Sequence, residues 1–317
     1  MKKTIAIVLP AYNEEATIAA TIAGFHSALP ESEFVIVNNN SSDNTGLVAE
    51  ETLKKLGICG RVLFESRGGK GNALRRAFLD TEADIYLLAD ADLTYPPERA
   101  GDLIEPILKN RADMVVGDRH SDGHYARENR RAMHGFGNQL VRWLVNSLFR
   151  AQLVDIMSGY RAFNRTFIKN YPILVEGFEI ETDMTLHALH KRFRILEVPI
   201  EYHDRPAGSI SKLNTVSDGA KVLFTIAQIL RYYRPLIFFG AISFLLMMTG
   251  LLAAIPVFQD WILERYIRHV PLAVLASGLE IVAMMLLGIG LTLDSIAHQQ
   301  QLEYERHLLA THVPPIS

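Results

Sequence analysis

The chain has 317 residues, with 32 Lys and Arg against 35 Asp and Glu, which gives a formal net charge of −3. This length is enough to bury a core of ordinary size, and the near-neutral balance offers no global cationic field, which argues against a dedicated nucleic-acid binder. The single cysteine, Cys59, cannot form an internal disulfide, and no Cys/His cluster has zinc spacing.

Short apolar runs alternate with helical patterns along the first part of the chain. Strands are predicted at 4–9, 33–38, 61–65, 84–89 and 112–117, and helices near 14–28, 43–56, 70–81 and 97–110. This repeated βαβ pattern predicts an α/β domain with a largely parallel sheet. Ligands bind such sheets beyond the carboxyl ends of the strands, so the polar residues after each run are the candidates for a site.

Two polar segments follow the first two predicted strands. After the first, Pro10 is expected to end strand pairing and Asn13 to cap a helix that carries Glu14 in its first turn. After the second, residues 38–45 gather amide and hydroxyl groups that could hold a nucleobase and a ribose. A plain turn with a helix cap explains residues 38–45 equally well.

The third and fourth strands are followed by groups suited to a phosphate and a metal. Residues 67–73 are glycine-rich and contain Lys70, so their backbone could approach an anion at a helix N-terminus, although the spacing is not that of a Walker A loop. Asp90 and Asp92 lie on one face if the strand continues, and two such oxygen ligands suit Mg²⁺ or Mn²⁺ bridging phosphates. A solvated face is the alternative, but carboxylates at the end of a buried strand would be unpaired without a cation.

A basic segment follows the fifth strand. Arg119, Arg127, Arg130 and Arg131 lie close together in the sequence, either as a solvated basic face or as a site that captures a phosphate. A phosphate monoester is largely dianionic at neutral pH, so as an acceptor it needs no strong general base.

The last third of the chain predicts membrane attachment. Residues 235–258 contain no charged residue and residues 270–293 contain only Glu280, so both are predicted transmembrane helices, and Glu280 should face protein. Residues 205–234 carry five Lys and Arg against one acid, which predicts a cytoplasmic flank and places both termini in the cytoplasm. Residues 213–234 suggest an amphipathic juxtamembrane helix, or else a plain connecting helix.

These segments, in this order, resemble the inverting family 2 glycosyltransferases of the GT-A fold, above all the polyprenyl-phosphate hexosyltransferases of bacterial and archaeal cell membranes. The resemblance rests on 10–14, 42–43, 69–71, 90–92, 117–119, 155–161, 178–181 and 205–212. It implies a GT-A catalytic domain over 1–212, a juxtamembrane helix over 213–234, two membrane helices within 235–293 and a C-terminal tail over 294–317. It also makes a homo-oligomer plausible.

The resemblance implies a nucleotide-sugar donor, a polyprenyl phosphate acceptor, Mg²⁺ or Mn²⁺, and transfer of one sugar with inversion. It assigns the metal to Asp90 and Asp92 and a mobile gating loop to 205–212, with Arg205, Gly208, Ser209 and Lys212. The expected catalytic residues are Asp92, Asp155, Arg161 and Glu181, and those for the acceptor phosphate are Arg119, Arg130, Arg131, Asn138 and Ser158. The expected nucleotide-sugar residues are Pro10, Tyr12, Asn13, Glu14, Asn39, Ser42, Asp43, Lys70, Gly71, Asp90 and Ala91.

Two features depart from that pattern. Asn38 and Asn39 stand where family members usually have two aspartates, which leaves the bound base open. Residues 139–143 read Q-x-x-R-W, a string found in processive polysaccharide synthases, but there it follows an acidic motif, whereas here Glu181 comes about forty residues later. A processive synthase and a catalytically silent membrane-bound partner remain the alternative functions.

Overall fold

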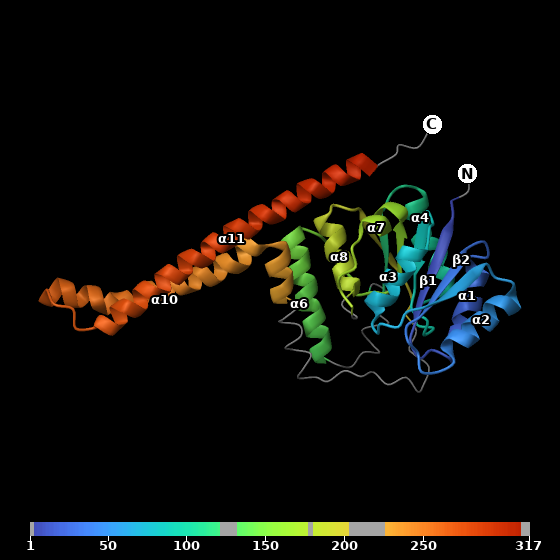
Figure 1. Ribbon diagram of the computed structural model, residues 1–317, viewed down its shortest axis with the longest axis horizontal. Helices are drawn as coiled ribbons and strands as arrows, with labels where there is room; N and C mark the ends of the chain where they lie inside the picture. Colours follow the sequence, from blue (N-terminus) through green and yellow to red (C-terminus); the bar gives the residue numbers. More distant parts are fainter. Residues whose placement is uncertain (1–2, 121–131, 177–179, 203–225, 312–317) are drawn as a thin grey trace. The chain divides into compact units, whose positions relative to one another are not determined.

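The computed structural model describes residues 3–120, 132–176, 180–202 and 226–311 (Figure 1). The gating loop predicted at 205–212 and the side chains of Arg130 and Arg131 lie outside these residues. The chain divides into two compact units, Met1–Thr215 and Val216–Ser317.

The first unit is built on a seven-stranded sheet. The strands are β1 (Ile5–Ala11), β2 (Glu33–Asn38), β3 (Gly60–Phe64), β4 (Ile85–Leu88), β5 (Met114–Asp118), β6 (Arg161–Asn164) and β7 (Ile195–Pro199), in the spatial order β3-β2-β1-β4-β6-β5-β7. All neighbouring pairs are parallel except those of β6, which is antiparallel to β4 and β5. The predicted α/β fold with a mostly parallel sheet is confirmed, with one reversed strand inside it.

Helices cover both faces of this sheet. They are α1 (Ile18–Ala28), α2 (Thr45–Leu56), α3 (Lys70–Asp80), η1 (Pro97–Arg99), α4 (Ala100–Leu108), α6 (Ala132–Phe149), α7 (Arg165–Asn170) and α8 (Ile180–His190). In β1, Ile7 and Leu9 pack in the core with α1, α2 and α4, while Ala6 and Val8 pack in the core with α3, α7 and α8. Both faces of the sheet are therefore buried, as expected of a central parallel strand.

The turn after β1 differs from the sequence expectation. Pro10 does not end the pairing: β1 continues to Ala11, with Pro10 opposite Val37. Asn13 does not cap α1 either, because the helix begins at Ile18 and Asn13 has a left-handed backbone with φ 56°. A proline that needs no donor at its position in the ladder leaves the strand intact.

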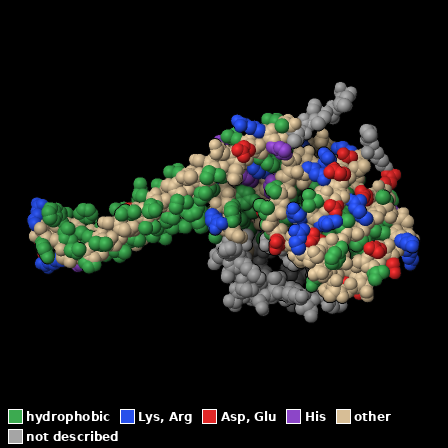
Figure 2. All heavy atoms as spheres, viewed as in Figure 1, with side chains coloured by type: hydrophobic (Ala, Val, Ile, Leu, Met, Phe, Trp, Pro, Cys, Tyr) green, Lys and Arg blue, Asp and Glu red, His purple; other side chains and the backbone are tan. Residues whose placement is uncertain are grey.

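The second unit contains two long helices, α10 (Pro235–Glu264) and α11 (Val270–Thr311), which lie side by side (Figure 1). Both are long and apolar enough to cross a membrane: each contains an 18-residue stretch with a mean hydropathy of 2.3 in α10 and 2.2 in α11. They extend beyond the predicted spans 235–258 and 270–293, and α11 continues through most of the predicted tail. Large apolar side chains cover their exposed surface (Figure 2).

Two polar side chains, Ser243 and Glu280, lie at the contact between α10 and α11. The Ser243 hydroxyl donates to the Ala283 carbonyl at 2.6 Å. The Glu280 Oε1 atom is buried without a hydrogen-bond partner among the described residues, and a Cβ placed on Gly250 would lie 2.6 Å from it. The carboxyl group of Glu280 thus faces protein, as its sequence position suggests, and that protein is α10 of the same chain.

Candidate active site

The loops after β1 and β2 are joined by hydrogen bonds. The Asn13 N–H donates to Ser41 Oγ at 3.0 Å, and Asn13 Oδ1 accepts the Ser42 N–H at 2.8 Å. The Glu15 carboxylate accepts the backbone and side-chain N–H groups of Asn44 at 3.0 and 3.1 Å. These contacts hold the two loops together, and the Tyr12 side chain is exposed on the surface that they form.

Asp43 strengthens the same junction. One carboxylate oxygen accepts the Thr45 N–H at 3.0 Å and the Thr45 hydroxyl, and the other accepts the Glu15 N–H at 3.2 Å. Burial acts to raise the pKa of Asp43, but the hydrogen bonds from Thr45 and Glu15 outweigh burial and hold that pKa below its ordinary value. Glu14 joins through its N–H, which donates to the Thr45 hydroxyl at 2.8 Å.

Asn39 uses both the donor and the acceptor of its side-chain amide within the chain. Its side chain is buried, its Nδ2 donates to the Arg67 carbonyl at 2.6 Å, and its Oδ1 accepts the Gly69 N–H at 2.8 Å. An ionised aspartate could accept from Gly69 but could not donate to the carbonyl of Arg67. Asn39 therefore holds the loop after β3 in place.

The glycines of that loop allow close contact with another part of the chain. Gly69 has φ +113°, and a Cβ there would lie 2.1 Å from the Glu176 carbonyl oxygen; a Cβ on Gly71 would lie 1.9 Å from the Val175 carbonyl oxygen. The Gly71 N–H donates to the Glu176 carbonyl at 3.1 Å. The glycines expected to admit an anion thus admit the backbone of residues 175–176, and this N–H at the start of α3 is already bonded.

Lys70 lies between two carboxylates. Its ammonium forms ion pairs with Asp90 and Glu181, and the Lys70 and Glu181 side chains are each only 8 % exposed. Burial acts to lower the pKa of Lys70, but the charges of Asp90 and Glu181 outweigh it and raise that pKa above its ordinary value. Asp90 therefore has the cation that its position at the end of a buried strand predicted, and within the chain that cation is Lys70.

Asp92 lies in the loop after β4. Its buried carboxylate accepts the Thr94 N–H at 3.2 Å and the Thr94 hydroxyl at 2.6 Å, and Leu93 between them has a left-handed backbone with φ 63°. Strained backbone of this kind often occurs at functional sites. The preceding carbonyl, of Ala91, accepts the Thr21 hydroxyl at 3.1 Å, which ties the loop to α1.

The two aspartates fit a divalent cation that takes its other ligands from a bound phosphate. No group of three or more His, Cys, Asp and Glu side chains capable of holding a metal occurs among the described residues. Mg²⁺ is commonly bound by one or two carboxylates together with waters and substrate phosphates. Asp90 and Asp92 match this donor set and do not form a complete protein cage.

Gly159 and Tyr95 lie beside Lys70, and neither was predicted from the sequence as a site residue. A Cβ on Gly159 would lie 2.9 Å from Lys70 Nζ, 3.0 Å from Asp90 Oδ2 and 3.3 Å from the Tyr95 hydroxyl. The Gly159 N–H donates to that hydroxyl at 2.9 Å. The available signal was the position of Tyr95 three residues after Asp92, and of Gly159 within the segment 155–161.

Arg119 and Asp155 form a second buried ion pair. The Arg119 Nε and Nη2 atoms donate to the two Asp155 carboxylate oxygens at 2.7 and 2.9 Å, and the two side chains are 11 % and 1 % exposed. Burial acts to raise the pKa of Asp155, but the Arg119 guanidinium outweighs burial and holds it below its ordinary value. The guanidinium also lies over the Tyr202 ring, 5.5 Å from its centroid.

Glu197 supports this pair and was not a sequence candidate. Its carboxylate accepts the Val154 N–H at 2.9 Å and the Asp155 N–H at 2.7 Å, so it fixes the backbone that carries Asp155. Burial raises the pKa of Glu197 above its ordinary value despite these two bonds. The signal in the sequence was a glutamate among the apolar residues 195–199, since a charged residue in a partly buried strand needs partners.

Arg161, expected to be catalytic, and Ser158, expected to bind the acceptor phosphate, have no exposed surface. Arg161 donates to the Ser158 carbonyl at 2.7 Å, to the Ile156 carbonyl at 2.8 Å and to the Thr185 hydroxyl at 2.9 Å. Its guanidinium therefore supports the 156–158 backbone from inside.

The remaining candidates lie on α6 or outside the described residues. Asn138 is in α6, but its side chain is outside the described part, as are Arg130, Arg131 and the predicted gating loop. In the Q-x-x-R-W string, Trp143 is 64 % exposed, and Arg142 donates to the Val154 carbonyl at 3.2 Å.

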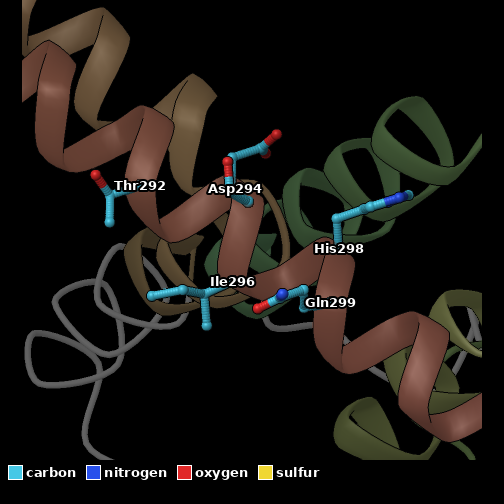
Figure 3. Close-up of a pocket in the computed structure, with 6 residues that line it drawn as sticks. Thr292, Asp294, Ile296, His298 and Gln299 are labelled. Atoms are coloured by element: carbon cyan, nitrogen blue, oxygen red, sulfur yellow. The ribbon is translucent and has the colours of Figure 1, made fainter.

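A surface hollow on α11 has no part in these clusters. All its lining residues come from consecutive turns of one helix (Figure 3): Thr292, Asp294, Ser295, Ile296, His298 and Gln299. A hollow lined by one helix lacks the convergent polar groups of a binding site.

Comparison with known proteins places these features in a family. The Glycosyl transferase family 2 pattern matches residues 6–171, just over half of the chain. Glycosyltransferase AglJ of Haloferax volcanii is 30 % identical over 94 % of this chain and 96 % of its own length. The polyprenol monophosphomannose synthase of Mycolicibacterium smegmatis is 26 % identical over 70 % of this chain and 85 % of its own.

A solved structure shares the fold. Glucosyl-3-phosphoglycerate synthase from Mycobacterium tuberculosis, solved with Mn²⁺, uridine diphosphate and phosphoglyceric acid, superimposes with a TM-score of 0.55 and 23 % identity. The superposition covers 72 % of this chain and 78 % of that one. The family 2 pattern over more than half of the chain and the 30 % identity to AglJ over nearly its whole length show that this chain belongs to glycosyl transferase family 2 and is a glycosyltransferase.

Proposed function

We propose that this glycosyltransferase moves a single hexose-type sugar from a nucleotide diphosphate sugar to a polyprenyl phosphate at a membrane surface, with inversion of the anomeric centre. The observation that carries the proposal is the combination, in one chain, of a family 2 domain with two exposed apolar helices. A polyprenyl chain stays in the bilayer, so an enzyme that glycosylates its phosphate must work at that surface.

Relatives support this choice of acceptor. Besides the mannose synthase, the undecaprenyl-phosphate mannosyltransferase of Micrococcus luteus is 28 % identical over 63 % of this chain and 84 % of its own length. The dolichyl-phosphate hexose transferase of Haloferax volcanii is 27 % identical over 71 % of this chain and 93 % of its own. A catalytically silent partner is disfavoured, because the chain keeps both aspartates after β4 and both buried ion clusters.

In the proposed reaction the donor occupies the joined loops after β1, β2 and β3, and Asp90 and Asp92 hold Mg²⁺ or Mn²⁺. When bound, that cation neutralises charge on the departing diphosphate. Asp155 orients Arg119 toward the acceptor phosphate, whose dianion attacks the sugar without a protein base. Arg130, Arg131, Asn138 and the loop 205–212 stay predictions for acceptor binding and closure, as do the cytoplasmic orientation and the homo-oligomer.

The test is a product assay on the full chain in detergent. The protein is incubated with Mn²⁺ or Mg²⁺, a panel of uridine and guanosine diphosphate sugars and a short polyprenyl phosphate. The mass of the lipid product is then measured by mass spectrometry. A product carrying one hexose, with anomeric configuration opposite to that of the donor, supports the proposal. A ladder of longer glycans would establish the processive alternative, and no lipid product with any donor would contradict the proposed acceptor.

A further inference from the structure

Lys70 has an unusual position for a lysine at the start of a helix. Its ammonium is bonded to Asp90 after β4 and to Glu181 of α8, and only 8 % of the side chain is exposed. The space is fitted to it, because any side chain at position 159 would place a Cβ 2.9 Å from Nζ. The ammonium is therefore a fixed internal counter-ion, unlike a mobile surface charge.

This counter-ion lies on a carboxylate that the proposed function assigns to the metal. A divalent cation that approaches Asp90 meets a positive charge already bonded to the same group, and the two repel one another. The protein offers the cation little in return, since only Asp90 and Asp92 are candidates and no larger acidic or histidine cluster occurs among the described residues. Without a phosphate ligand the cation should bind weakly.

A bound diphosphate would change this balance. It brings oxygen ligands for the cation and negative charge close to Lys70, which weakens the preference of the ammonium for Asp90. Glu181 gives the ammonium a second partner within the protein, so Lys70 can release Asp90 without becoming an unpaired buried charge. Binding of nucleotide and binding of metal are then positively coupled, and the coupling is reciprocal.

We propose that Lys70 is a positioning residue that competes with the divalent cation for Asp90, that Glu181 limits this competition, and that the pair makes metal binding depend on the nucleotide diphosphate. This inference rests on the proposed metal and nucleotide site, and it adds the order in which the two ligands bind: diphosphate first or together with the cation, and never a stably bound cation alone.

The test measures Mn²⁺ binding directly, by electron paramagnetic resonance of free Mn²⁺, on the full chain in detergent with and without uridine diphosphate. Lys70→Met removes the competitor, and we expect Mn²⁺ alone to bind about tenfold more tightly than to the wild type, the lower end of what one adjacent charge achieves. Glu181→Gln leaves the ammonium to Asp90 alone, so Mn²⁺ alone should bind no more tightly than to the wild type.

The double variant Lys70→Met with Glu181→Gln separates competition from net charge. It removes one positive and one negative charge, so the net charge of the cluster is that of the wild type while Asp90 is free of the ammonium. Tighter Mn²⁺ binding by this double variant supports competition. Wild-type affinity in the double variant would show that Lys70 acts only through net charge and would overturn the proposal.

Further variants and outcomes separate the competition from unspecific charge effects, misfolding and the absence of a metal site. Lys54→Met removes an exposed lysine from α2 and should leave Mn²⁺ binding unchanged. If Lys70→Met fails to fold, which circular dichroism and thermal melting would show, the double variant still tests the competition with a single carboxylate left unpaired. If wild-type protein binds no Mn²⁺ even with uridine diphosphate, the proposed metal site itself is wrong and the competition falls with it. If uridine diphosphate strengthens Mn²⁺ binding in the wild type but Lys70→Met binds Mn²⁺ alone with wild-type affinity, the competition is overturned and the proposed metal site stands.

Discussion

The buried pair of Arg119 and Asp155 yields a prediction whose size follows from its geometry. Asp155→Asn keeps the shape of the side chain but removes its charge, and Arg119 loses a two-point ionic contact of 2.7 and 2.9 Å. Removing one partner of a buried ion pair costs about 3–5 kcal/mol, and the remaining amide oxygen favours the lower end. With about 2–4 °C per kcal/mol for a unit of this size, the melting temperature should fall by about 6–12 °C.

The pH dependence gives a second, independent check of the same change. The pKa of Asp155 in the folded chain lies below its ordinary value, so its contribution to stability is present above that ordinary value, 3.8. The contribution is lost as the pH falls through the lowered folded value. The gap in melting temperature between wild type and Asp155→Asn should therefore stay constant from neutral pH to about pH 4 and close only below it.

The assay is scanning fluorimetry of the full chain in detergent. Asp102→Asn is the matched control, because Asp102 pairs with Arg99 at 2.7 Å but both side chains are more than 40 % exposed. An exposed pair is worth about 0–1 kcal/mol, so this control should melt close to the wild type. If Asp155→Asn melts no lower than Asp102→Asn, the Arg119 pair does not stabilise the fold and the reasoning fails.

Four other changes test the site. Asp92→Asn, or chelation of the metal, should remove most sugar transfer with the melting temperature unchanged, and full activity in either case would contradict the metal role. Arg119→Lys should raise the acceptor KM more than the donor KM, because lysine cannot make the two-point contact; equal effects would argue against it. Asn39→Asp should destabilise the chain by about 1–3 kcal/mol through the unsatisfied Arg67 carbonyl, measured by urea unfolding, and a neutral effect would refute that bond. Burial raises the pKa of Glu197, so the protonated form is favoured in the fold and its contribution is lost as the pH rises above 4.5. Glu197→Gln should therefore gain stability relative to the wild type between pH 4.5 and 7, and an unchanged difference would contradict the raised pKa.

Most of the sheet could be predicted from the sequence because four of its strands, β1, β2, β4 and β5, are buried on both faces. Continuous apolar runs such as 33–38 and 84–89 have no other common explanation in a chain with this βαβ rhythm. The antiparallel strand β6 could not be predicted, since Arg161–Asn164 has four residues and begins with a charged one. Its pairing with β4 and β5 comes from the fold as a whole and not from a local pattern.

Many residues of the candidate site could be predicted from the sequence, but the contacts between them could not. The rule that ligands bind at the carboxyl ends of strands found Lys70 and Asp90, while Asp155 came from the family resemblance. The rule could not show that Lys70 reaches Glu181, which lies 111 positions later. It also misjudged the loop glycines, because Gly71 makes room for the backbone of residues 175–176. Pairings of this range depend on how the loops pack, which no local spacing encodes.

A short segment, residues 155–161, connects the two ion clusters. It begins with Asp155, which holds Arg119, and it contains Gly159, whose missing side chain leaves room for Lys70 and Asp90. Arg161 at its end is fully buried and bonds the carbonyls of residues 156 and 158, so the segment cannot shift without breaking those bonds. The group proposed for the acceptor phosphate and the groups proposed for the donor diphosphate are thus set by the same rigid backbone. This arrangement can hold two anionic substrates in a fixed relative position. Holding the reactants in this way lowers the entropic part of the activation barrier for transfer.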